Sequence, residues 1–232
     1  MKTHLLLLPG LLCDDALWFE QVQALSGQCD CTIADMTQDD TIAGMAARAL
    51  ARVPERFAVA GLSMGGYAAM EIMRQAPERV DRLALLDTSP GADTAERMEI
   101  RRDLIKKVEA GDFTGVTEGH FQKFVHPSRL SDKPLMAKIR ASADHVGPDA
   151  YIRQQNAIIK RPDSTATLGK VSCPTLVLCG AEDALTPPAL HDQMAALIPG
   201  ATLVKVKGSG HLPTLENPEA VNAALRNWLG LS

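Results

Sequence analysis

The chain has 232 residues, a formal net charge of −4 and a hydrophobic content of 46%. This length suits one α/β domain, and the apolar share is large enough to build a single core. The slightly acidic balance argues against the basic face that nucleic-acid binding requires, so we expect no nucleic-acid partner. No apolar run is long enough to span a bilayer, and the five cysteines lack zinc-ligand spacing. We therefore expect a cytoplasmic protein with reduced thiols and no membrane partner.

Short apolar runs, bounded by Gly, Pro, Asp or charged residues, predict strands that are buried on both faces. They are His4–Leu8, Cys31–Ala34, Phe57–Ala60, Leu83–Leu86, Thr175–Cys179 and Thr202–Val206. Between them, apolar residues at helical spacing predict helices over Ala16–Leu25, Ile42–Val53, Met64–Gln75, Ala189–Ile198 and Ala220–Leu229. This alternation predicts βαβ units, and hence a doubly wound, mostly parallel sheet of about six strands.

One long interval, from Ala92 to Leu168, breaks the alternation because its patterns are helical throughout. A crossover between parallel strands needs only about a dozen residues, and this interval is several times longer. We therefore predict a core formed by residues 1–91 and 169–232, with a helical cap inserted at residues 92–168. The alternative is that these helices extend the outer layer of the sheet.

A candidate nucleophile lies in the sequence Gly61-Leu62-Ser63-Met64-Gly65-Gly66, between a predicted strand and a predicted helix. Glycines on both sides of Ser63 permit a tight strand-to-helix turn that lifts the hydroxyl away from the sheet. The alternative is a glycine-rich βα turn without catalytic function. The strand before the motif and the helix after it favour a nucleophile elbow.

A serine nucleophile needs a base and an acid that orients it. His211 lies in a glycine-containing loop beyond the last predicted strand, which could carry it over the sheet. We interpret the other histidines as surface or packing residues, although one in the cap could touch substrate: His4, His120, His126, His145 and His191. Asp183 follows the fifth predicted strand and is our candidate acid. Asp87, which follows the fourth predicted strand, is the alternative acid. If it is not the acid, its carboxylate forms hydrogen bonds within its own loop.

Acyl transfer also needs donors where negative charge develops on the carbonyl oxygen. Met64 follows the candidate nucleophile at a helix N-terminus, where free N–H groups favour an anion. The second donor should come from the loop after the first strand, and Leu11 is our choice. A simple turn at Leu11 is the alternative.

In these motifs the chain resembles the α/β-hydrolase superfamily over nearly its whole length. The motifs are Leu8-Pro9-Gly10-Leu11-Leu12, residues 61–66, residues 79–88, residues 173–183 and Gly210-His211. The resemblance implies an α/β-hydrolase fold and a triad in the order Ser63, Asp183, His211. The segments around Asp87 and Ala92 are similar to small bacterial capped hydrolases of the carboxylesterase and 3-oxoadipate enol-lactonase kind. Many relatives carry His-Gly where this chain has Pro9-Gly10, and many begin with a β-hairpin, which we do not expect here.

The sequence thus predicts a serine hydrolase that acts on a small ester or related acyl substrate through an acyl-enzyme, without a metal or organic cofactor. The same scaffold also supports C–C bond hydrolysis, lactone opening or a lyase reaction, and a ligand receptor with little turnover is a further alternative. Arg101 and Arg102 are candidates for a contact with a substrate carboxylate, or else form a solvated helix face.

Overall fold

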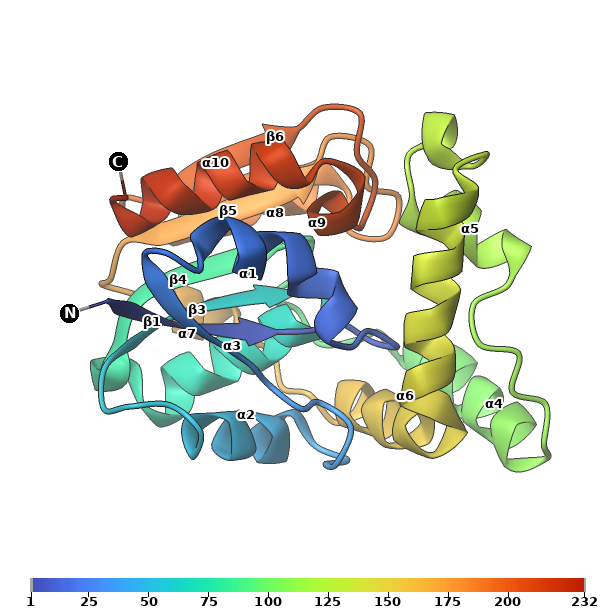
Figure 1. Cartoon of the computed structure of the whole chain (residues 1–232). Coiled ribbons are helices and arrows are strands. Elements are labelled where there is room, and N and C mark those ends of the chain that lie inside the picture. Colours follow the sequence, from blue (N-terminus) through green and yellow to red (C-terminus); the bar gives the residue numbers. More distant parts are fainter. Residues whose placement is uncertain (1, 232) are drawn as a thin grey trace.

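Six strands form one sheet in the order β2-β1-β3-β4-β5-β6, as a computed structural model that describes residues 2–231 shows (Figure 1). Every neighbouring pair is parallel. The strands are β1 Thr3–Leu8, β2 Cys29–Ile33, β3 Phe57–Leu62, β4 Val80–Leu86, β5 Thr175–Gly180 and β6 Thr202–Val206. The predicted doubly wound sheet is confirmed.

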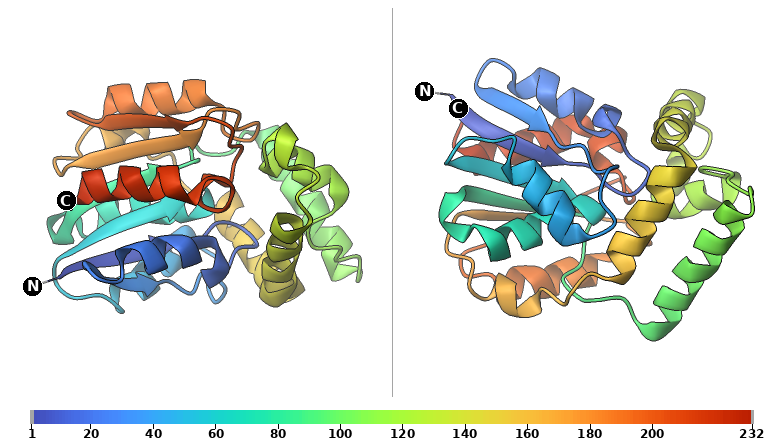
Figure 2. Two further views of the ribbon diagram at one scale, coloured as in Figure 1. Left: turned by 45° about the horizontal axis from the view of Figure 1, so that its top comes forward. Right: turned by 90° about the horizontal axis from the view of Figure 1, so that it is seen from below.

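The apolar runs form strands because the sheet is covered on both faces. In β1, Leu5 and Leu7 pack into the core on one face, whereas Leu6 and Leu8 pack into the core on the other, and all four are fully buried. One face is covered by α1 (Phe19–Leu25) and α10 (Pro218–Leu229). The other is covered by α2 (Ile42–Leu50), α3 (Met64–Gln75), α7 (Thr165–Leu168) and α8 (Pro188–Leu197) (Figure 2).

Local capping sets the helix ends and corrects two predicted boundaries. The expected helix Ala16–Leu25 is split, because the Asp14 carboxylate caps a short 3-10 turn over Asp15–Trp18 and α1 begins only after it. The helix expected over Ile42–Val53 ends at Leu50.

Residues 92–168, here called the helical segment, join β4 to β5. They contain α4 (Ala95–Glu109), α5 (Glu118–Phe124), a 3-10 turn at Pro127–Arg129, α6 (Lys133–Ile159) and α7. Helices α4, α5 and α6 lie beyond the carboxyl ends of the strands, whereas α7 packs against the sheet layer beside α3 and α8 (Figures 1 and 2). Helix α6 breaks at Gly147, whose φ of 73° is costly for other residues, and Pro148 follows.

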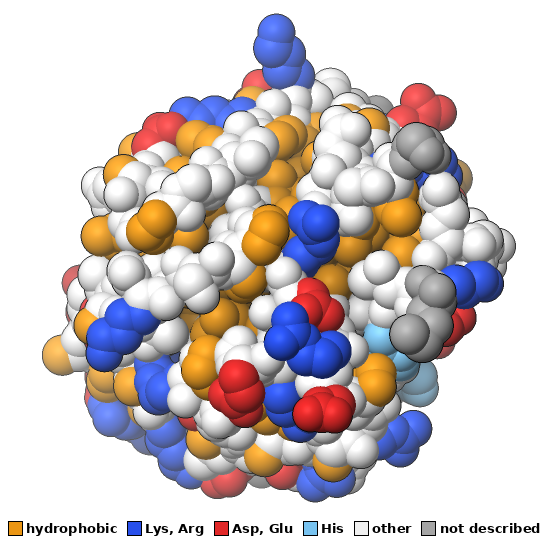
Figure 3. Space-filling model, turned by 90° about the vertical axis from the view of Figure 1, so that its left-hand side faces the viewer, with side chains coloured by type: hydrophobic (Ala, Val, Ile, Leu, Met, Phe, Trp, Pro, Cys, Tyr) orange, Lys and Arg blue, Asp and Glu red, His pale blue; other side chains and the backbone are white. Residues whose placement is uncertain are grey.

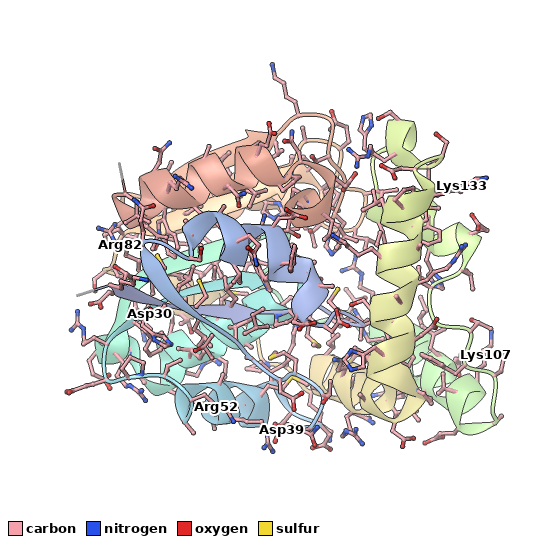
Figure 4. All side chains as sticks on the ribbon, viewed as in Figure 1. Asp30, Asp39, Arg52, Arg82, Lys107 and Lys133 are labelled. Carbon is pink, nitrogen blue, oxygen red and sulfur yellow. The ribbon has the colours of Figure 1, made fainter. Side chains whose placement is uncertain are left out.

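The helical segment lies at one end of the molecule (Figure 1). Lys107 of α4 and Lys133 of α6 lie on the helical segment, at the end opposite to Asp30 and Arg82 (Figure 4). On that opposite end, charges of both signs are interspersed with hydrophobic side chains (Figure 3). Within the described residues, no helix has the length and apolar character needed to cross a membrane.

Candidate active site

The four segments that follow β3, β4, β5 and β6 meet at the carboxyl edge of the sheet, beside the helical segment (Figure 1). Backbone hydrogen bonds extend the ladder to this edge: Ser63 N–H donates to the Leu86 carbonyl at 3.0 Å, and Asp87 N–H to the Leu178 carbonyl at 2.9 Å. Crevices at the carboxyl ends of such sheets are the usual place for ligands.

Ser63 occupies a strained turn between β3 and α3. Its φ of 55° and ψ of −114° lie in a region that residues with a Cβ rarely adopt. The turn is possible because Gly65 has no side chain: a Cβ there would lie 1.9 Å from the Leu8 carbonyl oxygen. The Ser63 carbonyl accepts hydrogen bonds from Gly66 N–H at 2.9 Å and from the Thr88 hydroxyl at 2.8 Å. The chain therefore forms the strand–turn–helix that the sequence predicts here.

His211 and Asp183 form a buried pair. Nδ1 of His211 lies 2.8 Å from Oδ2 of Asp183, and the two residues are 5% and 3% exposed. Asp183 also accepts hydrogen bonds from the backbone N–H groups of Leu185 and Thr186 and from the Thr186 hydroxyl, at 2.8, 3.1 and 2.6 Å. Burial alone would raise the pKa of Asp183, but the charge and hydrogen bond of His211 and the Thr186 donors lower this pKa to about 2. Asp183 is therefore an ionised acceptor that fixes the imidazole.

The remaining polar atoms of the candidate nucleophile and base are unengaged. Within residues 2–231, neither Oγ of Ser63 nor Nε2 of His211 makes a hydrogen bond. The sheet brings both residues to one edge, and no hydrogen bond joins them in this structure. Catalytic hydrogen bonds are often long before substrate binds.

Asp87, the alternative acid, has a different environment. It is fully buried, and its Oδ1 accepts a hydrogen bond from Gly180 N–H at 2.8 Å. Burial, and then the neighbouring charge of Asp183, raise the pKa of Asp87 well above its usual value. The imidazole of His211 is hydrogen-bonded to Asp183 and not to Asp87. The geometry thus pairs the histidine with the carboxylate that stays ionised.

Asp87, Asp183 and His211 also offer three ligand atoms within 4.8 Å of one another, a spacing that could suit a cation. A cation would compete with the three hydrogen bonds that Asp183 accepts from Leu185 and Thr186, and with its bond to the imidazole. These donors fit an imidazole–carboxylate pair better than a metal centre.

The candidate oxyanion donors are available. Within the described chain, the backbone N–H groups of Leu11 and Met64 donate no hydrogen bond, whereas the N–H of Leu12 donates to Oε1 of Gln154 at 3.0 Å. The loop lies against the nucleophile, because a Cβ on Gly10 would be 3.5 Å from the Cβ of Ser63. Two free donors therefore flank the serine.

Two supporting residues were not identified from the sequence. His191 of α8 is fully buried, and its Nε2 accepts a hydrogen bond from Thr88 N–H at 3.1 Å. Thr88 in turn holds the Ser63 carbonyl through its hydroxyl. Burial lowers the pKa of His191, which favours the neutral ring that this contact requires. Nothing local in the sequence marks this contact, because 103 residues separate its partners.

A cavity of about 20 Å³ lies between the sheet edge and α6. It is lined by Leu12, Cys13, Ala16, Leu17, Lys138, Ile139, Ser142, Leu212 and Leu215. Leu12 and Leu212, which line this space, are the chain neighbours of Leu11 and His211.

Both candidate carboxylate-binding arginines already have acidic partners. Nε of Arg101 lies 2.5 Å from Asp93, and its Nη1 donates to Gln155 at 2.7 Å. Arg102 pairs with Glu99 at 3.0 Å on an exposed helix face.

Comparison with known proteins agrees with this architecture. The alpha/beta hydrolase family matches residues 5–224. A pimeloyl-[acyl-carrier protein] methyl ester esterase of Nitrosomonas europaea is 33% identical over 175 residues, which cover 72% of this chain and 69% of that protein. The structure of a thermophilic esterase from Thermogutta terrifontis superposes with a TM-score of 0.91 at 30% identity, covering 99% of this chain and 90% of that one. An enol-lactonase from Burkholderia xenovorans shares the fold, with a TM-score of 0.88, 21% identity, and coverage of 99% and 92%.

The fold and the family match define an α/β hydrolase. The chain belongs to the alpha/beta hydrolase family and is a hydrolase.

Proposed function

We propose that the protein is a serine esterase in which Ser63, His211 and Asp183 form the catalytic triad. The observation that carries this proposal is the buried 2.8 Å contact between His211 and the ionised Asp183, at the sheet edge where the strained Ser63 turn also lies. Asp183 holds the proton of the neutral imidazole on Nδ1, which leaves Nε2 as the base that faces the site.

In the proposed reaction, Nε2 of His211 takes the proton of the Ser63 hydroxyl as Oγ attacks the ester carbonyl. The backbone N–H groups of Leu11 and Met64 donate to the resulting oxyanion, and Asp183 stabilises the imidazolium. The imidazolium then protonates the departing alcohol, which leaves an acyl-enzyme on Ser63. Water, activated by the same imidazole, hydrolyses this ester and restores the serine.

Two observations support a small ester as the substrate. Two matched relatives that are at least 30% identical to this chain are esterases, and one of them is named for a methyl ester. The 20 Å³ cavity beside Leu12 and Leu212 has room for a methyl-sized apolar group, and Ile139 of α6 forms one wall of it. The helical segment would then act as a cap that shapes the substrate pocket and excludes water.

Hydrolysis of a series of aryl esters of increasing acyl length tests the proposal. We expect a burst of about one phenol per chain followed by steady turnover, because acylation and deacylation are separate steps. Short esters should have the highest kcat/KM. A chain that binds these esters without turning them over would be a receptor and not an enzyme.

A further inference from the structure

The loop that carries His211 depends on the helical segment for its backbone hydrogen bonds. His211 lies between β6 and the short helix α9 (Pro213–Glu216), in a stretch without regular structure. Its N–H donates to the carbonyl of Phe124, at the end of α5, at 2.8 Å. The candidate base is therefore bonded through its own backbone to a residue of the helical segment.

Glu216 makes a second connection between the same two regions. Its side chain is buried, and the residue is only 4% exposed. Oε1 accepts hydrogen bonds from the N–H groups of Gly210 and Leu212, the residues on either side of His211, at 2.9 and 3.2 Å. Oε2 accepts from the N–H of His126, in the helical segment, at 2.6 Å. One carboxylate thus bridges the base loop and the segment.

Further contacts join the His211 loop and Glu216 to the helical segment. Nη1 of Arg129 donates to the backbone carbonyl of Glu216 at 2.8 Å. A Cβ on Gly210 would lie 2.8 Å from the carbonyl carbon of Val125 and 2.9 Å from the nitrogen of His126, so the two backbones are in direct contact. Burial raises the pKa of Glu216, and the donors from His126, Gly210 and Leu212 oppose that rise. The carboxylate stays buried because these donors replace its hydration.

We propose that Glu216 is a positioning residue that fastens the His211 loop to residues 124–129, which makes this part of the helical segment a support of the general base. This inference rests on the proposed function. One oxygen of the carboxylate holds the amides on both sides of His211 and the other holds the segment, so the carboxylate sets the backbone position from which the imidazole extends. Any opening of the helical segment must then occur elsewhere, because movement at residues 124–129 would displace the base.

The direct test compares Glu216→Gln with Glu182→Gln. The amide keeps the size of Glu216 but places an NH2 group against one set of N–H donors, so one side of the bridge is lost. Glu182 is the matched control, since it is exposed and accepts one hydrogen bond, from Ser209 N–H of the same loop, at 3.2 Å. For Glu216→Gln we expect kcat and the rate of fluorophosphonate labelling to fall together by about a hundredfold with KM nearly unchanged, as for an active-site group displaced by about 1 Å. Glu182→Gln should match the unmodified protein.

A second pair of variants keeps the carboxylate and alters only the helical segment. His126→Pro replaces the N–H that faces Oε2 with a ring carbon, and the native φ of −57° suits proline. His126→Ala keeps the N–H and removes the same imidazole, so it sets the baseline. We expect kcat of His126→Pro to be about tenfold below that of His126→Ala. This pair decides the question if Glu216→Gln does not fold.

Native rates in folded Glu216→Gln, or equal rates in the two His126 variants when Glu216→Gln is unfolded, would overturn the positioning role. Those results differ from a failure of the proposed function, in which the unmodified protein itself would not be labelled at Ser63.

Discussion

The sheet edge and the helical segment are built differently. The strands are anchored by parallel hydrogen-bonded ladders and fully buried leucines, whereas in α4, all of whose residues are described, Ile105 alone is buried. Around α4 the segment is held by polar contacts: Asp93 pairs with Arg101 at 2.5 Å and with Arg161 at 2.9 Å, and the Arg161 guanidinium stacks 4.1 Å from the Tyr67 ring. In contrast, α5 and α6 bury apolar side chains. We therefore expect a rigid edge to position the reacting groups and the α4 part of the segment to be held less firmly. Substitutions at the sheet edge should lower the turnover of all substrates, whereas substitutions in the helical segment should change the ranking among substrates. Residues 124–129 are the exception, because they contact Glu216 and the His211 loop.

The largest effect is expected at the edge itself. Ser63→Ala should lower kcat by about a million-fold for every ester, as loss of the nucleophile does in other triads. The thermal unfolding curve should change little, because the hydroxyl makes no hydrogen bond within the described residues. Residual turnover near the native rate would mean that another residue is the nucleophile.

The next largest effect should distinguish the two buried carboxyl groups, Asp183 and Asp87. Asp183→Asn should cost about ten-thousandfold in kcat, because the variant removes the charge that stabilises the imidazolium. Asp87→Asn should cost less than about tenfold, since a protonated acid and an amide are nearly alike. Steady-state kinetics of both variants with one aryl ester provides the measurement. The reverse ranking would assign the acid to Asp87.

Substitutions in the helical segment should change the free energy of unfolding and the preference among substrates. Arg101→Ala should lower the free energy of unfolding by about 2 kcal/mol, since Asp93 loses a charged hydrogen-bond donor. Arg102→Ala, the control on the same helix, should have little effect because its pair with Glu99 is exposed. If either arginine also binds a substrate carboxylate, its removal should raise KM for acidic esters and spare matched neutral ones. Equal changes for both ester types would reject that contact.

The smallest effect concerns stability against pH. The folded state keeps a proton on Asp87 at pH values where the unfolded chain, with a pKa near 3.9, releases it. Folding therefore becomes less favourable as pH rises above about 4, and Asp87→Asn removes this penalty. The variant should melt a few degrees above the native protein at pH 7 and at the same temperature near pH 3. A constant difference across this range would show that folding does not raise the pKa of Asp87.

Local patterns were enough to predict most of the framework. Apolar runs marked the six strands, and the glycines around Ser63 marked the turn, because each signal lies within about ten residues. Asp183 and His211 could be named because each follows a predicted strand of one parallel sheet, whose carboxyl ends share an edge.

Long-range polar contacts could not be predicted in this way. Glu216 bonds to His126 across 90 positions, and His191 to Thr88 across 103. Glu216 lies between His211 and the last predicted helix, Ala220–Leu229, where a glutamate is ordinarily solvated. The packing of the helical segment against the His211 loop adds the donor from His126 to the two donors from Gly210 and Leu212.

Labelling with a fluorophosphonate, followed by digestion with trypsin, tests the central claim most directly. Ser63 is the only serine of the expected peptide from residue 57 to residue 74, so the modified position can be read without ambiguity. The account predicts one label per chain, on this peptide, and no label in Ser63→Ala. Labelling that persists in Ser63→Ala, or ester turnover by a chain that takes no label at Ser63, would contradict it.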